Sequence, residues 1–200
     1  MNTVEYLLNA YKTFDSLESG DLEKFRLFTD EYGIRIYDRT PNQPVITASA
    51  VVVNTEFTRA LLTHHKLHGF YKQFGGHADG NPDLPQVASD ELFDESGANG
   101  ALLTNYPIDL IRWDFPDRTK GGIYFPAHDC FDIAFLFMMS EKTKLKPNKN
   151  EALDTKWVSL DEWRDYSAPN NPTYQSNPQN FEYQQRIYKK IKIFERIRKR

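Results

Sequence analysis

The chain has 200 residues, a formal net charge of −3 and a hydrophobic fraction of 40%. A chain of this length can bury roughly 70% of its unfolded surface, and an aromatic content of 14% excludes an intrinsically disordered protein. The acidic balance argues against a nucleic-acid-binding protein. The lone cysteine, Cys130, excludes a disulfide framework and a cysteine-based zinc site.

The sequence also argues against a membrane protein. It has no apolar run near the ~20 residues that cross a bilayer. Its first residues lack the charged and then apolar segments of a signal peptide. We therefore expect a cytoplasmic protein.

Helical patterns open the chain. Residues 2–16 place apolar side chains on one stripe, with Asn2 beginning a capping box. Asp21 is expected to cap a second helix that ends before Gly33. We predict that residues 1–33 form an N-terminal helical extension packed on the domain, with a substrate lid or a dimer contact as alternatives.

Strand patterns dominate the centre of the chain. The first is β-branched and small with little polar alternation, which suits a strand buried on both faces. Turns are expected at 54–56 and 116–122, and a loop at 140–155. The predicted strands are 45–53, 57–63, 108–115, 130–139 and 156–158.

The end of the chain returns to helix. Ser159 is expected to start a short helix, residues 167–180 are rich in proline and asparagine and predict a loop, and the last 20 residues predict a basic helix. Its inward side chains are expected to be Ile187, Ile191, Phe194 and Ile197. We predict a central domain over 34–166 and a C-terminal segment over 167–200.

Carboxylates crowd the stretch that precedes the third predicted strand. If residues 84–95 form a helix, Glu91 and Glu95 lie one turn apart and Asp94 lies beside them. Like charges at this spacing repel, and a bound divalent cation removes the repulsion. Oxygen ligands of this kind suit Mg²⁺, or Mn²⁺ in its place.

The same stretch has local signals for the ends of a helix and for a buried face. Asp83 is a suitable N-cap, and Gly97 is a suitable residue just beyond the C-terminus. Apolar residues at helical spacing lie opposite the carboxylates, so one face can enter a core. They are Leu84, Val87, Ala88 and Leu92.

From residue 76 to residue 98 the sequence resembles the Nudix box, G-x5-E-x7-R-E-U-x-E-E-x-G-U, where U is apolar. The spacing is kept, and Asp94 is an acid where the box has Glu. The box has Glu at the position of Pro82 and Arg at the position of Asp90. The matching residues are Gly76, Glu91, Leu92, Glu95, Gly97 and Ala98.

The residue at position 90 leaves several interpretations open. In the family the arginine typically orients a catalytic carboxylate, and Asp90 cannot do this. Asp90 could raise the pKa of a neighbour, bind a second cation, or mark a site that has lost turnover.

The resemblance implies an α/β fold, an α/β/α sandwich with a mixed sheet in which the box forms a loop-helix-loop. It also implies Mg²⁺-dependent hydrolysis of a diphosphate linkage in a nucleoside diphosphate derivative. The implied metal ligands are the Gly76 carbonyl, Glu91, Asp94 and Glu95, with Glu91 and Glu95 as the catalytic residues.

Substrate contacts are expected around the box. Lys66 and Lys72 can neutralise a polyphosphate, and His77 lies in the box loop. The stretch around His128 and Asp132 resembles a segment of a bacterial Nudix subgroup, which implies an added ligand or acid–base role for Asp132; a turn or a sheet edge is the alternative. The histidines near residue 65 lie on no clear helix and do not favour zinc.

A rival hypothesis is a Nudix-fold binding module that holds a nucleotide or a protein without cutting it. Asp90 and the basic C-terminal helix favour this rival, whereas the acidic cluster favours the hydrolase. A homodimer is compatible with either hypothesis.

Overall fold

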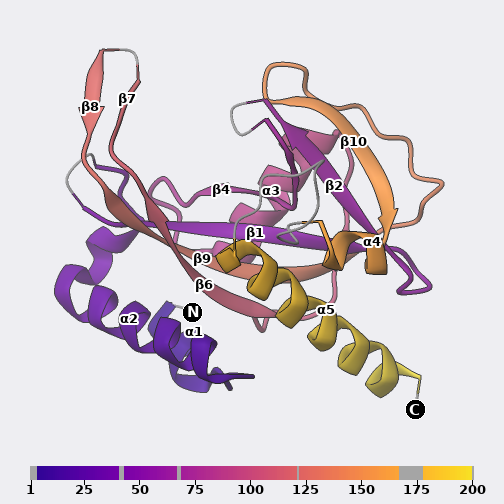
Figure 1. The fold of residues 1–200 in the computed structure, drawn as a ribbon, viewed down its shortest axis with the longest axis horizontal. Helices are drawn as coiled ribbons and strands as arrows, with labels where there is room; N and C mark the ends of the chain where they lie inside the picture. The colour runs from indigo at the N-terminus through magenta and orange to yellow at the C-terminus, as the bar shows by residue number, and fades with distance from the viewer. Residues whose placement is uncertain (1–3, 41–42, 67–68, 121, 167–177, 200) are drawn as a thin grey trace. The chain divides into compact units, whose positions relative to one another are not determined.

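The computed structural model describes residues 4–40, 43–66, 69–120, 122–166 and 178–199. These residues form a mixed α/β fold (Figure 1). The chain divides into two compact units. The first unit takes residues 1–49, 75–88 and 104–135, and the second takes residues 50–74, 89–103 and 136–200.

The first unit combines N-terminal helices with strands, of which β6 pairs antiparallel with β9 and β7 with β8. Its elements are α1 (Val4–Ala10), α2 (Ser16–Tyr32), the 3₁₀ helix η1 (Gly33–Tyr37), the start of β1 (Val45–Val53), most of β4 (Phe74–His77), β6 (Asp109–Phe115), β7 (Arg118–Lys120), β8 (Ile123–Phe125) and most of β9 (His128–Met138). Phe25 and Phe28 of α2 contact the Phe131 ring of β9, with centroid distances of 4.8 and 4.6 Å. Aromatic packing of this kind fixes α2 on the strands.

The second unit contains the ends of β1 and β9 and the C-terminal helices. The helix α3 (Leu84–Ser96) begins in the first unit and ends in the second. The other elements are β2 (Arg59–His65), β3 (Tyr71–Lys72), β5 (Ala101–Leu102), β10 (Ala152–Ser159), α4 (Leu160–Arg164) and α5 (Pro178–Arg198).

The sheet is mixed, as the sequence predicts. In the second unit the strand order is β10-β2-β1-β9-β5, with β2 antiparallel to both β1 and β10. The Met139 N–H after β9 donates to the Val53 carbonyl at the end of β1, at 2.9 Å. Near the starts of the same strands, Thr47 Oγ1 lies 3.5 Å from Cys130 Sγ. Contacts at both the starts and the ends of the strands mean that β1 and β9 run parallel.

The first predicted helix is too long, and the second is predicted to start too late. α1 ends at Ala10, and α2 begins at Ser16 because Asp15 is its N-cap. The Asp15 carboxylate accepts from Glu18 N at 2.9 Å, and the Glu18 carboxylate accepts from Phe14 N at 2.7 Å. These two bonds satisfy backbone donors that open the helix and prevent α1 from continuing into it. The Asn2 cap lies outside the described residues.

Turn chemistry accounts for the corrected strand boundaries. β2 begins at Arg59, not at Phe57, because Phe57 has φ of 57° and the Asn54 side chain accepts from Thr58 N and Arg59 N at 2.8 and 3.0 Å. The predicted turn at 116–122 is instead largely the β7–β8 hairpin, which projects at the upper left of Figure 1. β10 also takes residues that were predicted as loop.

The other predicted strands and the C-terminal helix are confirmed. The exception is the predicted inward position of one side chain of that helix. β1 has the predicted bounds and is buried along its whole length. Ile187 and Ile191 of α5 are buried, but Ile197 is 66% exposed and does not face inward. Most of the predicted 167–180 loop lies outside the described residues, and its last three residues are instead the start of α5. The predicted domain boundaries stay a prediction.

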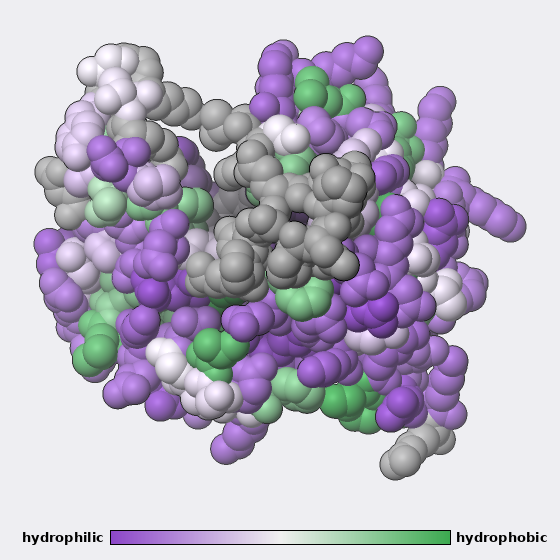
Figure 2. Space-filling model, in the orientation of Figure 1, coloured by the Kyte–Doolittle hydropathy of each residue, from purple (hydrophilic) through white to green (hydrophobic). Residues whose placement is uncertain are grey.

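Apolar side chains on the face drawn in Figure 2 form small patches that are separated by polar surface. Scattered exposed apolar residues are normal for a folded protein. None of the described helices has both the length and the apolar character that a bilayer-crossing segment needs.

Candidate active site

The predicted box helix is present as α3, and its ends are held as expected. Asp83 Oδ1 accepts from Gln86 N at 3.2 Å at the start of the helix. Gly97 N donates to the Phe93 carbonyl at 2.7 Å at its end, and Gly97 has φ of 69°. Both are the capping contacts that leave few helix-end groups unsatisfied.

The two faces of α3 are also as predicted. The Leu84, Val87, Ala88 and Leu92 side chains are buried. On the acidic side the burial is graded: Glu95 is 1% exposed, Glu91 is partly buried, and Asp94 is exposed. A carboxylate as buried as Glu95 costs free energy unless its charge is compensated, so its position calls for a functional or structural partner.

Glu91 has the perturbed ionisation that is typical of a catalytic group. Burial, followed by the charge of Glu95, raises the pKa of Glu91 from 4.5 to about 7. This value already includes smaller contributions from the Lys72 ammonium, which lowers the pKa, and from Glu151 and Asp94, which raise it. A carboxylate with a pKa near the working pH can accept a proton and release it again.

Glu151 also belongs to this cluster of acidic side chains around Glu91, although no pattern in the sequence indicates it. The loop that carries it is fastened to the C-terminal end of α3, where Lys146 N donates to the Ser96 carbonyl at 2.7 Å and Asn148 N donates to the Glu95 carbonyl at 3.3 Å. Backbone bonds of this kind leave no side-chain motif in the sequence. Only the presence of an acidic residue in a polar loop could have pointed to Glu151.

The loop is held from its other end by the predicted substrate-binding region. Lys66 N donates to the Glu151 carbonyl at 2.8 Å, and the Lys66 side chain is exposed. Lys72 lies in β3, within electrostatic reach of Glu91. The second unit therefore brings together Glu91, Asp94, Glu95, Lys72, Glu151 and the Lys66 backbone.

The remaining predicted site residues belong to the first unit. Gly76 and His77 lie in β4, directly after Gly75, which has φ of 155°. A Cβ at Gly75 would lie 2.5 Å from Ser49 Oγ, so only glycine lets β4 approach β1 this closely. That Gly76 and His77 contact metal or substrate stays a prediction.

Asp132 lies in the interior of the sheet. Its carboxylate accepts from Thr47 Oγ1 at 2.6 Å and from Ser49 Oγ at 2.8 Å, and only 3% of the residue is exposed. Asp132 pairs with Ile111 of β6, in a strand that has neighbours on both sides. The alternative of a turn or a sheet edge is therefore wrong, whereas a substrate contact of Asp132 stays a prediction.

The chemistry of the Glu91–Glu95 pair fits Mg²⁺. The described part of the chain has no group of three His, Cys, Asp or Glu side chains gathered at metal-binding distance. Mg²⁺ keeps several water ligands and is commonly held by one or two carboxylates together with substrate phosphates. A buried Glu95 and a partly buried Glu91 that repel one another supply such a pair.

Comparisons with known proteins now bear on this geometry. No protein-family model matches the sequence, and no curated protein matches it. Among solved structures, a NUDIX-family hydrolase from Clostridium perfringens superposes with a TM-score of 0.53 and 17% identity, covering 74% of this chain and 97% of that one. The chain has the Nudix fold.

A second solved structure superposes on a similar share of the chain. The dihydroneopterin triphosphate pyrophosphohydrolase of E. coli superposes with a TM-score of 0.51 and 14% identity, covering 77% of this chain and 96% of that one. Identities this low establish the shared fold alone. Within the Nudix fold of this chain, α3 is the helix of the predicted box.

Replacing Gly97 by alanine is expected to destabilise the protein, because the loop that carries Glu151 packs against Gly97. A Cβ at Gly97 would lie 2.5 Å from the Lys146 carbonyl oxygen, and the positive φ already disfavours alanine. We expect the free energy of unfolding to fall by roughly 1–3 kcal/mol, which thermal unfolding would record as a fall in Tm of several degrees. Gly20→Ala is the control because a Cβ there meets no atom within 4 Å. Equal Tm values for the two variants would contradict the close packing at Gly97.

Proposed function

We propose that this protein is a Mg²⁺- or Mn²⁺-dependent hydrolase of a diphosphate linkage in a nucleoside diphosphate derivative. The observation that carries the proposal is the raised pKa of Glu91 beside the buried Glu95, on the box helix of a Nudix fold. A carboxylate poised near neutral pH in a cluster of acids is typical of a general base.

The proposed roles follow from the positions of the side chains. Glu91 and Glu95 would hold the metal together with substrate phosphates, and contacts from Asp94 and the Gly76 carbonyl stay predictions. When bound, the metal gathers diphosphate oxygens and lowers the pKa of water. Glu91 accepts the proton of the attacking water as the water oxygen bonds to phosphorus and the bridging P–O bond breaks.

Basic and polar groups around the acids are proposed to bind the substrate. The Lys72 ammonium lies near Glu91 and would offset the charge of a diphosphate. Lys66, His77 and Asp132 are proposed as further substrate contacts. The E. coli neighbour is named as a pyrophosphohydrolase of a triphosphate, which is related chemistry and supports the proposal.

Glu151 is proposed to act with Glu91, because its charge already raises the pKa of Glu91. Glu151→Gln is expected to lower kcat by roughly 10- to 100-fold, the range found when a supporting group at a metal site is removed. Lys149→Gln is the control on the same loop and should keep kcat within about twofold. Steady-state kinetics at saturating Mg²⁺ make the comparison. Unchanged kcat in Glu151→Gln would remove this residue from the proposed mechanism.

The second candidate function is a binding module with the same fold. It is favoured by Asp90, an exposed acid at the position of the box arginine. The module hypothesis predicts that a nucleotide raises Tm without Mg²⁺ and that no product forms with Mg²⁺. The hydrolase hypothesis predicts product formation that EDTA abolishes.

A further inference from the structure

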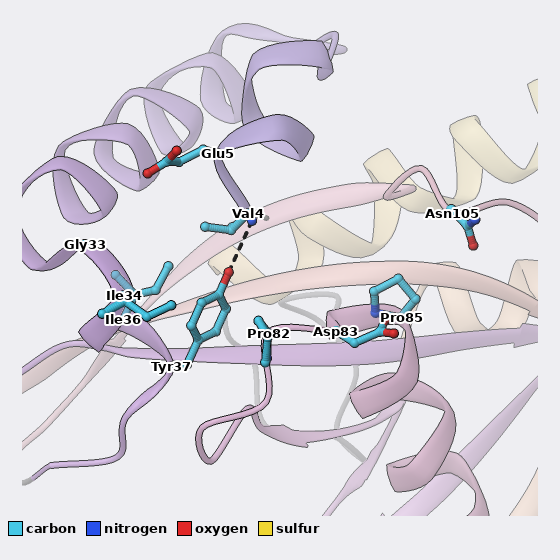
Figure 3. Close-up of a pocket in the computed structure, with 10 residues that line it drawn as sticks. All are labelled: Val4, Glu5, Gly33, Ile34, Ile36, Tyr37, Pro82, Asp83, Pro85 and Asn105. Carbon is cyan, nitrogen blue, oxygen red and sulfur yellow. Dashed lines mark hydrogen bonds between the residues drawn. The ribbon is translucent and has the colours of Figure 1, made fainter. Parts of the chain in front are cut away.

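A cavity of about 680 Å³ lies in the first unit, built without Glu91, Glu95 or any other member of the acidic cluster on α3. Its walls come from α1, η1, the loop that leads into α3 with the first residues of α3, and Asn105, as Figure 3 shows. Cavities of roughly 300–1,000 Å³ are the size that encloses a small organic ligand.

Most of the wall is apolar. Aliphatic and proline side chains, together with the Tyr37 ring, offer a surface that favours an apolar body over water. In Figure 3 the isoleucines of η1 lie on one side of the Tyr37 ring and Pro82 lies on the other. The apolar lining residues are Val4, Ile34, Ile36, Tyr37, Pro82 and Pro85.

The charged side chains of the wall are both acidic. Glu5 and Asp83 line the cavity, and no lysine or arginine is among the lining residues. Neither carboxylate belongs to an ion pair within the described part of the chain. The cavity therefore carries a negative charge that the described part of its own wall does not balance.

Nearby arginines have other contacts. The Arg35 guanidinium lies over the Tyr32 ring at 5.8 Å, and Arg39 lies 3.7 Å from the Asp79 carboxylate. Asp83 keeps its role at the start of α3, where one of its oxygens accepts from Gln86 N at 3.2 Å. A carboxylate has about four lone-pair sites, so this one bond leaves acceptor capacity at Asp83.

The Tyr37 side chain lies within electrostatic reach of Glu5. Its hydroxyl accepts from Val4 N at 3.2 Å, drawn as the dashed line in Figure 3. Burial raises the pKa of Tyr37, the hydrogen bond from Val4 N lowers it, and the Glu5 charge makes a smaller contribution that raises it. The charge of Glu5 thus reaches the buried ring that forms part of the wall.

We propose that this cavity is a binding site for a small organic cation, an amine carried on an apolar aromatic or aliphatic body. The apolar wall would take the body, and the ammonium group would meet one of the two exposed carboxylates, Glu5 or Asp83, which lie on different sides of the cavity in Figure 3. The site is separate from the proposed hydrolase chemistry and does not depend on it.

Three probes with a common indole body test the proposal on the full-length protein. Tryptamine is the cation, tryptophol is its neutral counterpart, and indole-3-propionate is the anion. Protein-observed NMR titration gives each dissociation constant and places the shifts. We expect tryptamine to bind roughly two- to fivefold more tightly than tryptophol, from one solvated charge contact, and the anion to bind most weakly.

The variants separate charge from shape. Glu5→Gln combined with Asp83→Asn removes both charges, and asparagine keeps the N-cap of α3. In this double variant the affinities for tryptamine and tryptophol should become equal within about twofold. Glu23→Gln, an exposed change on α2, should leave the preference unchanged.

Several results would overturn the proposal. They are the absence of saturable tryptamine binding by the wild type, equal binding of cation and anion, and shifts that lie outside the cavity. A preference for tryptamine that survives in the double variant would also overturn it. Because no readout involves turnover, these results are independent of the hydrolase proposal.

Discussion

Replacing Glu91 by glutamine is expected to lower kcat by roughly 10²- to 10⁴-fold, the usual contribution of a general base. The same change is expected to stabilise the metal-free protein at alkaline pH. A side chain whose removal costs activity but increases stability is typical of a functional site. Steady-state kinetics and thermal unfolding of one variant therefore test both expectations.

The sign of the stability change follows from the pKa of Glu91, which is about 7 in the folded protein and 4.5 for an ordinary glutamate. The folded state favours the protonated form, so the stabilising contribution is complete below pH 4.5 and is lost as the pH rises through 7. At pH 8 the ionised wild type should be less stable than Glu91→Gln by roughly 1–3 kcal/mol, after allowance for solvent screening.

The experiment compares the Tm of wild type and Glu91→Gln at pH 5 and pH 8 in EDTA. The advantage of the variant should grow by several degrees between the two pH values. Glu31→Gln, an exposed change on α2, should show no such growth. Mg²⁺ should narrow the difference at pH 8, because it stabilises only the protein that binds it. A pH-independent difference would contradict the burial and repulsion that are assigned to Glu91.

Replacing Glu18 by glutamine is expected to give the largest loss of stability, roughly 2–4 kcal/mol. Glu18 of α2 is fully buried, and its carboxylate accepts from the Tyr11 hydroxyl, Phe14 N and Leu110 N. Glutamine replaces one acceptor oxygen by an N–H₂ donor, so a donor would face a donor in a fully buried site. The carboxylate thus joins the N-terminal segment to β6.

Urea unfolding measures this loss. Glu23→Gln lies on the exposed side of the same helix and should change the free energy of unfolding by less than about 0.5 kcal/mol. If the two variants lost the same amount, the Glu18 contacts would not be what holds α2 and β6 together.

The elements that were predicted best are those whose signals are local. α3 is within one residue of its predicted bounds, because Asp83, Gly97 and the apolar stripe all lie inside one short segment. β1 is equally well predicted from its apolar run. The start of α2 was missed because Asp15 and Asp21 are both suitable caps, and the contacts of Glu18 with distant Leu110 favour the earlier start.

The candidate site likewise combines residues that a local pattern indicates with one that only distant contacts bring in. Glu91, Asp94 and Glu95 could be placed together because one helix carries them. Glu151 could not, because backbone bonds between a distant loop and the end of α3 bring it there. The raised pKa of Glu91 is likewise a consequence of burial, which no spacing in the sequence specifies.

The most direct test of the proposed hydrolase function is metal-dependent turnover in the wild type and in Glu95→Gln. Each protein is incubated with Mg²⁺ or Mn²⁺ and a panel of nucleoside diphosphate derivatives, dinucleoside polyphosphates and nucleoside triphosphates, and released nucleoside monophosphate or phosphate is measured. We predict cleavage by the wild type that is lost in EDTA and in Glu95→Gln. Activity that persists in Glu95→Gln would contradict the hydrolase proposal. So would a wild type that binds metal and cleaves nothing on the panel. That second result would favour the binding module and make Asp90→Arg the next variant.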